Sequence, residues 1–320
     1  MIHIQSVGGL GNQLFIYAAA RAIQLDTGEE IAIYDYHRES NPLTRRTSEK
    51  MVPKLESIHY VDLKPTSPAV FKKTAPVRSF LYLSIHKIYR TLFHVTSDSA
   101  YHKMYCKLQP IWNRLGFCLS GLGYIPFRRY HWPRDYFLIG YFFSRRYWGN
   151  HSEEIREELY HPELISDRNT ALAEEMRSCN AVAVHIRLGD YVDNPYFRNF
   201  LYVCSPEYYR DAVAAAYRDL NDPVFYVFTN DREKAMQFPF PAEAKLVFVP
   251  EGNSAVEDLQ LMAQCKHFIV SNSTFSWWGQ FLSTNPNKKV YSPDQWYRDD
   301  RPADFYEEDW VKIRITLPEL

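Results

Sequence analysis

The sequence predicts an α/β protein with two domains, each built on a mostly parallel sheet that is covered by helices. Residues 181–291 alternate short apolar runs with helical segments, which is the order of a parallel sheet. Residues 1–35 show the same order of strand, glycine turn, helix and strand. At 320 residues the chain is about twice the length of a typical domain, so it can bury two hydrophobic cores.

The first domain is predicted to span residues 1–160. Its expected elements follow from apolar runs that end in a turn signal and from apolar residues at helical spacing. They are a strand over 2–7, a glycine turn, a helix over 13–26, a strand over 31–35, and helices near 80–94 and 100–116. Residues 36–150 are rich in proline, aromatic and basic side chains, so we expect a helical, basic and aromatic insertion in this domain.

The second domain is predicted over residues 161–295, where strands and helices alternate most regularly. The expected strands are 181–186, 224–229, 245–249, 266–270 and 288–291, and the expected helices are 206–219, 231–237, 254–265 and 275–283. This order predicts a parallel sheet with helices on both faces. The tail over 296–320 contains Trp296, Trp310 and an alternating segment, and we expect it to pack back onto the first domain.

Three polar or glycine-rich turns each follow a probable strand. Residues 185–191 read HIRLGDY, residues 271–279 read SNSTFSWWG, and residues 8–15 read GGLGNQLF. An open α/β sheet binds phosphorylated ligands at the carboxyl ends of its strands, so these turns predict a ligand site. For one isolated turn, a surface Arg187 capped by Asp190 is the simpler interpretation. Three turns of the same character favour the ligand site.

These three segments resemble glycosyltransferase family 11, the α-1,2-fucosyltransferases that use GDP-fucose. The family patterns are H-x-R-R-x-D-Y, N-S-T-F-S-W-W-G and G-G-L-G-N-Q-(M/L)-F, and the resemblance extends from residue 1 to about residue 291. The chain departs from the first pattern at Leu188, where the family has a second arginine, so any role of that side chain is absent or relocated. The resemblance implies a GT-B-like fold: two facing Rossmann-like domains with a cleft between them, the first for the acceptor and the second for the GDP-sugar.

The resemblance implies inverting, metal-independent transfer of L-fucose from GDP-fucose to the 2-hydroxyl of a terminal galactose. The leaving β-phosphate gains negative charge, which a fixed guanidinium neutralises, and Arg187 is the candidate. No D-x-D pair follows a predicted strand, so no metal and no other cofactor is expected. The acceptor is then a galactose-terminated oligosaccharide or a lipid-linked glycan. Two alternatives stay open: a transferase with a different donor, linkage or acceptor, and a non-catalytic module that binds a nucleotide or carbohydrate.

The segment after the strand at 266–270 is expected to complete the donor site. Serine and threonine residues before a helix cap its free N–H groups, and the positive end of the helix dipole favours phosphate. The candidate donor contacts are Asn272, Ser273, Thr274 and Phe275. An ordinary helix N-cap is the alternative for residues 272–274, and Trp277 and Trp278 are predicted to lie in the core.

Several roles stay open. His185 either hydrogen-bonds the donor or braces its own loop. Asp190 is either the general base for the acceptor hydroxyl or the partner that holds Arg187 in place. Asn230 and Asp231 follow a predicted strand and are candidates to contact guanine or ribose.

The glycine turn near the N-terminus is the third candidate segment. If the turn faces the cleft, Gly9, Gly11, Asn12 and Gln13 contact the donor or the acceptor. The turn lacks the third glycine of a dinucleotide fingerprint, so it is a weak signal for a dinucleotide cofactor. The alternative is a tight turn that opens a helix.

Charge is distributed unevenly, although the net charge is only −1. Residues 71–148 contain 13 Lys or Arg against 2 Asp or Glu, together with 20 of the 51 aromatic residues. This composition fits sugar binding, contact with an anionic membrane, or aromatic packing in a helical subdomain; no nucleic-acid partner is expected. Five cysteines without C-x-x-C spacing and the lack of a signal peptide predict a cytoplasmic protein, with peripheral contact at the inner face of the cytoplasmic membrane as an open alternative.

Overall fold

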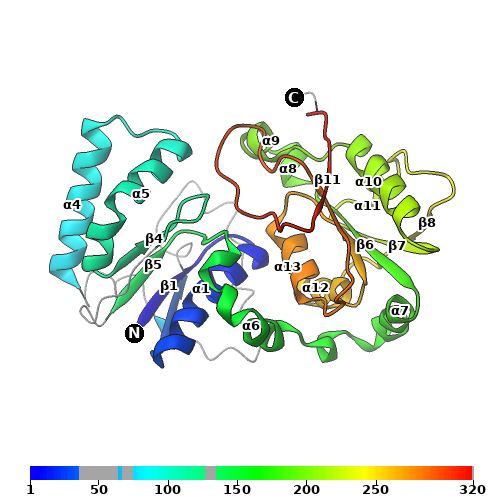
Figure 1. The fold of residues 1–320 in the computed structure, drawn as a ribbon, viewed down its shortest axis with the longest axis horizontal. Coiled ribbons are helices and arrows are strands. Elements are labelled where there is room, and N and C mark those ends of the chain that lie inside the picture. Colours follow the sequence, from blue (N-terminus) through cyan, green and yellow to red (C-terminus); the bar gives the residue numbers. More distant parts are fainter. Residues whose placement is uncertain (36–63, 67–74, 127–134, 319–320) are drawn as a thin grey trace. The chain divides into compact units, whose positions relative to one another are not determined.

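The computed structural model describes residues 1–35, 64–66, 75–126 and 135–318. The chain divides into two compact units, Met1–Glu158 with Arg301–Phe305, and Leu159–Asp300 with Tyr306–Leu320. The chain passes from the first to the second after Glu158, close to the predicted boundary at 160. Each unit contains a sheet whose paired strands run parallel (Figure 1). This finding confirms the predicted α/β class with two Rossmann-like domains, whereas the cleft between the domains stays a prediction.

The first unit is built on a five-stranded sheet with the order β3-β2-β1-β5-β4. Its strands are β1 (Ile2–Ser6), β2 (Ile31–Asp35), β3 (Lys64–Thr66), β4 (Phe117–Leu119) and β5 (Tyr136–Ile139). Helix α1 (Leu10–Thr27) connects β1 to β2, and almost all of its residues up to Ile23 are buried. A parallel pair needs such a crossover helix, which explains why the strand, helix and strand at the N-terminus were predictable.

Two further helices cover the β4 side of this sheet. They are α4 (Pro76–Leu92) and α5 (Asp98–Arg114), which confirm the helices expected near 80–94 and 100–116. The two helices pack through Tyr82 of α4, whose ring lies 5.2 Å from Trp112 of α5 and 4.7 Å from Phe117 of β4. Part of the aromatic content of this region therefore forms an ordinary core.

The second unit is built on a six-stranded sheet with the order β11-β10-β9-β6-β7-β8. Its strands are β6 (Asn180–Ile186), β7 (Pro223–Thr229), β8 (Lys245–Phe248), β9 (His267–Ile269), β10 (Val290–Pro293) and β11 (Val311–Ile313). Helix α6 (Ser152–Leu159) ends the first unit, and only its last residue belongs to the second. The helices of the second unit are α7 (Asp167–Ser178), α8 (Asp190–Asp193), α9 (Pro195–Leu201), α10 (Pro206–Asp219), α11 (Arg232–Ala235), α12 (Ala255–Ala263) and α13 (Thr274–Leu282).

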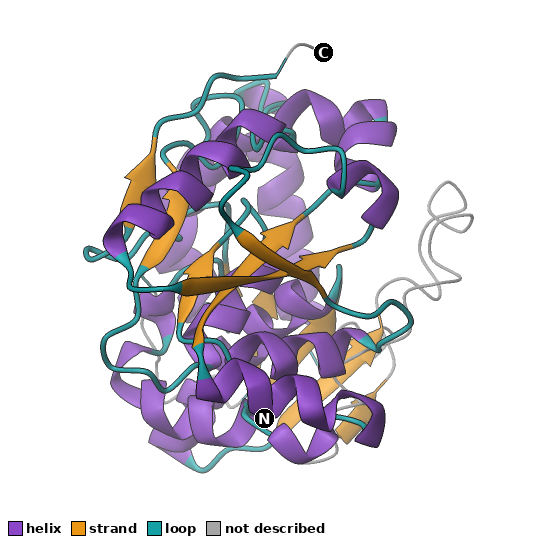
Figure 2. Ribbon diagram, turned by 90° about the vertical axis from the view of Figure 1, so that its right-hand side faces the viewer, coloured by secondary structure: helices purple, strands orange, loops and turns teal. Residues whose placement is uncertain are grey.

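Helices cover both faces of the second sheet (Figure 2). This is possible because successive side chains of each central strand point to opposite faces of the sheet. Val184 of β6 and Val227 of β7 pack with Tyr209 of α10 in one buried cluster. Tyr226 points to the other face, where its hydroxyl donates a 2.9 Å hydrogen bond to Glu175 of α7. The loops after β6, β7 and β9 therefore leave the sheet at its carboxyl edge, between the two helical layers.

The position of residues 296–320 contradicts part of the prediction for this tail. Strand β11 pairs in parallel with β10, so this end of the chain is the edge of the second sheet. The expectation that residues 296–320 pack onto the first domain is wrong for β11. It holds for Arg301–Phe305, which belong to the first unit and place the Phe305 ring 5.9 Å from Phe15. The alternating apolar pattern at 311–315 was the signal of a strand.

In the parts of the chain that the structure describes, no helix combines the length and the apolar character needed to cross a membrane. All five cysteines have free thiols.

Candidate functional site

The loop after β6 has a shape that depends on one glycine and one asparagine. Gly189 adopts a φ of +54° and a ψ of −114°, a backbone conformation that only glycine adopts readily. The Asn230 side chain, from the loop after β7, accepts a 2.9 Å hydrogen bond from the Leu188 N–H. A Cβ atom on residue 189 would lie 2.6 Å from Nδ2 of Asn230. The neighbouring loop therefore holds residues 187–190 in place.

Arg187 lies at the carboxyl edge with its charge accessible. Its Nη2 forms a 2.7 Å ion pair with Oδ1 of Asp190, and its guanidinium lies 5.4 Å from the ring centroid of Tyr191. The Arg187 and Asp190 side chains are 35% and 42% exposed. A half-exposed ion pair is weak, because water screens both charges, so an anionic ligand can take the place of Asp190 on the guanidinium.

His185 connects the β6 loop to the loop after β9. Its Nδ1 lies 2.8 Å from Oγ of Ser271, and its ring lies 5.5 Å from the ring of Phe275. Burial, together with the nearby Arg187 guanidinium, lowers the pKa of His185 to about 3. The imidazole is therefore neutral near pH 7 and acts as a hydrogen-bonding group. Because β6 pairs directly with β9, this contact brings the first two candidate segments together.

The start of α13 has the cap that the sequence predicted. Ser273 is the N-cap residue, and its Oγ accepts a 3.3 Å hydrogen bond from the Phe275 N–H. Ser273 is buried, while Thr274 and Phe275 are partly exposed. The first turn of this nine-residue helix therefore lies beside His185, where its N–H groups favour a negative charge.

The Asn272 side chain is held by contacts within the second unit. Its side chain is buried, and its amide group donates to the Leu201 carbonyl at 2.7 Å and to the Trp296 carbonyl at 3.0 Å. Both amide N–H donors are therefore used within the protein. The geometry gives Asn272 the role of joining its loop to α9 and to the segment after β10.

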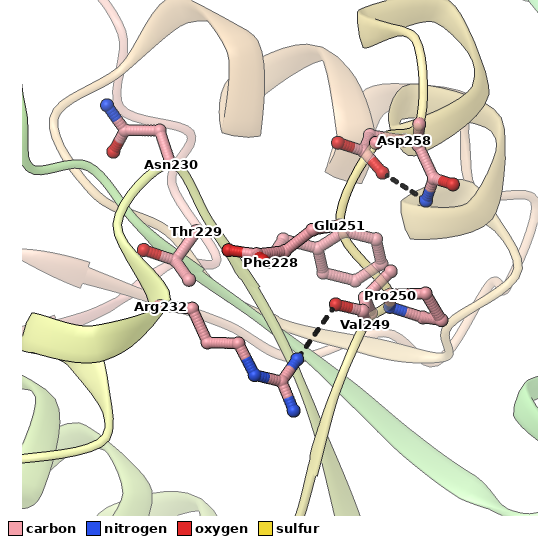
Figure 3. Close-up of a pocket in the computed structure, with 10 residues that line it drawn as sticks. Phe228, Thr229, Asn230, Arg232, Val249, Pro250, Glu251 and Asp258 are labelled. Atoms are coloured by element: carbon pink, nitrogen blue, oxygen red, sulfur yellow. Dashed lines mark hydrogen bonds between the residues drawn. The ribbon is translucent and has the colours of Figure 1, made fainter.

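A pocket of about 290 Å³ opens at the carboxyl ends of β7 and β8 (Figure 3). It is lined by Phe228, Thr229, Asn230, Arg232, Val249, Pro250, Glu251, Gly252, Asn253 and Asp258. Arg232 is anchored by a 3.3 Å hydrogen bond to the Val249 carbonyl, and Asp258 accepts a 2.8 Å hydrogen bond from Asn253. Burial raises the pKa of Asp258. The volume is at the lower end of ligand pockets, about 300 Å³, and suits one part of a larger ligand.

Asn230 connects this pocket to the Arg187 loop. It lines the pocket, and its side chain accepts the hydrogen bond from the Leu188 N–H in that loop. Asp231 lies beside it as the N-cap of α11, where it accepts from the Lys234 N–H at 3.1 Å and pairs with the Lys234 ammonium at 3.0 Å. Hydrogen bonding to Lys234 lowers the pKa of Asp231. The Asp231 carboxylate thus serves the helix terminus.

Other residues of the motifs lie in the core. The Leu188 side chain is buried with the α10 cluster, so at this position the chain packs an apolar group where the family pattern has arginine. Trp277 and Trp278 are 1% and 0% exposed, which confirms their prediction as core residues.

The glycine turn belongs to the first unit. Gly9 is the N-cap residue of α1, and Gly11 is buried in the first turn. The Gln13 side chain folds back to donate a 2.9 Å hydrogen bond to the Gly8 carbonyl. A Cβ on Gly8, whose φ is +78°, would collide with Asn12. These contacts stabilise a tight turn that opens a helix.

The described residues contain no group of three or more His, Cys, Asp or Glu side chains that would hold a metal ion. Independence from metal stays a prediction.

An accessible guanidinium, a capped helix start and a pocket at one edge of a parallel sheet are the features of α/β proteins that bind phosphorylated ligands. The chain belongs to glycosyltransferase family 11, because the model of that family matches residues 80–314.

Three relatives are similar to this chain over different shares of its length. An alpha-1,2-colitosyltransferase of Escherichia coli is 33% identical over 181 residues, which cover 55% of this chain and 62% of that protein. The O-antigen biosynthesis glycosyltransferase WbnK of Escherichia coli is 28% identical over 319 residues and covers 96% and 98% of the two chains. Galactoside alpha-(1,2)-fucosyltransferase 1 of Saimiri sciureus is 26% identical over 196 residues, 57% of this chain and 54% of that protein.

Proposed function

We propose that the protein transfers L-fucose from GDP-fucose to the 2-hydroxyl of a terminal galactose, with inversion at the sugar and without a metal ion. One observation supports this proposal most: Asn230 and His185 join three loops around the accessible guanidinium of Arg187. The relatives that carry α-1,2-fucosyltransferase names support the sugar and the linkage. The WbnK relationship supports O-antigen assembly as the setting, with an oligosaccharide or lipid-linked glycan as acceptor.

The two parts of GDP have separate places in this proposal. The base and ribose enter the pocket lined by Thr229, Arg232 and Asp258, where carboxylate and amide groups match the N–H donors of guanine. The diphosphate lies across Asn230, at Arg187 and the first turn of α13. A nucleoside diphosphate bound in this way extends from the pocket to the loop that Asn230 holds.

The chemistry follows from charge. As the bond between fucose and the β-phosphate breaks, negative charge grows on the phosphate oxygens. The Arg187 guanidinium donates two parallel hydrogen bonds, while the first turn of α13, which Ser273 caps, adds the positive end of a helix dipole. Neutral His185 orients Ser271 beside them. These groups are fixed before the reaction, so they stabilise the leaving group without reorganising.

Asp190 is, in this proposal, a positioning residue. Its 2.7 Å contact with Arg187 holds the guanidinium until the diphosphate arrives. An Asp190→Asn variant is expected to raise the KM for GDP-fucose about tenfold with a smaller fall in kcat, because the amide keeps a hydrogen bond but loses the charge. Steady-state kinetics with varied donor, together with calorimetric GDP binding, check this result. Normal GDP-fucose affinity with transfer abolished would instead identify Asp190 as the general base.

The proposed reaction is tested with purified protein, GDP-fucose and lactose in the presence of EDTA. We expect release of GDP and formation of a fucosylated trisaccharide, with the linkage and anomeric configuration read by NMR. Trisaccharide that forms only after Mg²⁺ or Mn²⁺ is restored would contradict the metal-independent mechanism. GDP release without trisaccharide would point to another acceptor.

A second candidate is transfer of a related sugar from its own nucleotide donor. The relative with 33% identity is named an alpha-1,2-colitosyltransferase, which is the observation that favours this alternative. Failure to bind or turn over GDP-fucose, combined with tight binding of GDP itself, would select it.

A further inference from the structure

Helix α4 presents a row of apolar side chains to solvent on the side away from its core contacts. The row consists of Val77, Phe80, Leu81, Ile88 and Leu92, which are between 40% and 70% exposed. At about 100° per residue these positions share one side of the helix, which we call the outer face of α4. Ser79 and Tyr82, both buried, lie toward the other side. A contiguous apolar face of this kind marks an interaction surface.

Exposed cationic side chains lie on both α4 and its neighbour α5. Lys87 and Arg90 of α4 are exposed, and α5 adds exposed Lys103, Lys107 and Arg114. The two helices lie close together at this end, because the Lys107 ammonium is 5.8 Å from the ring centroids of Tyr89 and Phe93.

No carboxylate offsets this charge along the two helices. Asp98 is the sole acidic residue between positions 76 and 114. Its carboxylate is paired with Nη1 of Arg301 at 2.8 Å. The two helices therefore combine an apolar row with an excess of positive charge.

We propose that the outer face of α4 and the cations beside it dock onto an anionic phospholipid surface. The apolar row enters the boundary between headgroups and acyl chains, while the positive charge of the two helices attracts the anionic headgroups. A second copy of this chain fits less well, because two such surfaces bring together like charges. The helix lies on the membrane and does not cross it, since it spans 17 residues and carries basic residues. This inference does not depend on the donor or the acceptor.

The proposal is tested by sedimentation with lipid vesicles. Full-length protein is mixed with phosphatidylcholine vesicles or with vesicles that contain about one third phosphatidylglycerol. We expect binding to the anionic vesicles, little binding to the neutral ones, and release when the salt is raised to about 0.5 M. Protein that ignores the anionic vesicles at low salt overturns the proposal.

Two sets of variants separate the apolar and the charged contributions. The triple change Phe80→Ser, Ile88→Ser and Leu92→Ser is expected to lower the vesicle partition coefficient at least about tenfold, because three exposed apolar groups no longer insert. The pair Lys87→Glu and Arg90→Glu is expected to lower it by a similar factor at low salt. Thermal melting of each variant establishes that the fold is retained.

Matched controls come from the second unit. Met236, 61% exposed, is changed to serine, and the exposed Lys245 is changed to glutamate. Neither is expected to alter vesicle binding. Equal loss of vesicle binding in the controls and the α4 variants would contradict a defined docking face.

Self-association is the other use of such a face. A wild-type dimer that the triple variant converts to a monomer, without vesicle binding, would assign the face to self-association and overturn the proposal. Transfer to a water-soluble acceptor is expected to stay unchanged in all these variants, so a failure here is distinct from a failure of the proposed reaction.

Discussion

Replacing Arg187 with alanine is expected to slow fucosyl transfer about a hundredfold or more, because one preorganised donor to a developing charge is lost. The change also leaves the Asp190 carboxylate facing the diphosphate without its 2.7 Å partner. Both effects lower kcat/KM for GDP-fucose, and the loss of the guanidinium donor also lowers kcat. Steady-state kinetics and calorimetric GDP binding measure the two separately.

Arg187→Lys is expected to be nearly as damaging as Arg187→Ala. A lysine keeps the charge, but its ammonium cannot match two phosphate oxygens with two parallel N–H groups. A lysine variant that retains most of the activity would refute the bidentate role.

The chain provides a matched control for this substitution. Arg210 and Asp211 form another ion pair in the second unit, at 2.8 Å with side chains 47% and 48% exposed. Arg210 lies on α10, outside the candidate site, so Arg210→Ala is expected to leave transfer unchanged. A similar loss of activity in both variants would show that the Arg187 effect comes from general surface charge.

Replacing Gly189 with alanine is the second change with a large expected effect. The φ of +54° disfavours any side chain, and the new Cβ would lie 2.6 Å from Nδ2 of Asn230. Asn230 cannot move away without breaking its hydrogen bond to the Leu188 N–H. The variant is expected to lose about 2–4 kcal/mol of unfolding free energy and most of its activity, because the Arg187 loop shifts. Urea unfolding and donor KM check both results.

Gly28→Ala separates the backbone cost from the collision. Gly28 also has a positive φ, +70°, but a Cβ there meets no atom within 4 Å. Its expected cost is about 1–2 kcal/mol, with activity retained. If Gly189→Ala costs no more than Gly28→Ala and leaves the donor KM unchanged, the contact with Asn230 does not hold the loop.

The candidate site could be predicted from the sequence in part. The turn at 185–191 and the cap before α13 were recognisable, since polar residues after an apolar strand mark the carboxyl edge of a sheet. The pocket walls at Arg232 and Glu251 were not recognisable, because they come from separate segments that carry no common motif. Asn230 was expected to contact a ligand. The structure shows that its side chain also accepts a hydrogen bond from the Leu188 N–H of the neighbouring loop.

The sequence by itself determined the local elements of this protein, because apolar periodicity and turn residues act over a few positions. It predicted the strands β6 to β10, the helices α10 to α13 that alternate with them, and the family to which the chain belongs. Only the tertiary structure decided the short strands β4 and β5, the edge position of the tail, and the burial of Leu188 and Asn272. A strand of three or four residues has no periodicity to read, and partners far apart in the chain meet only after the sheet register is set.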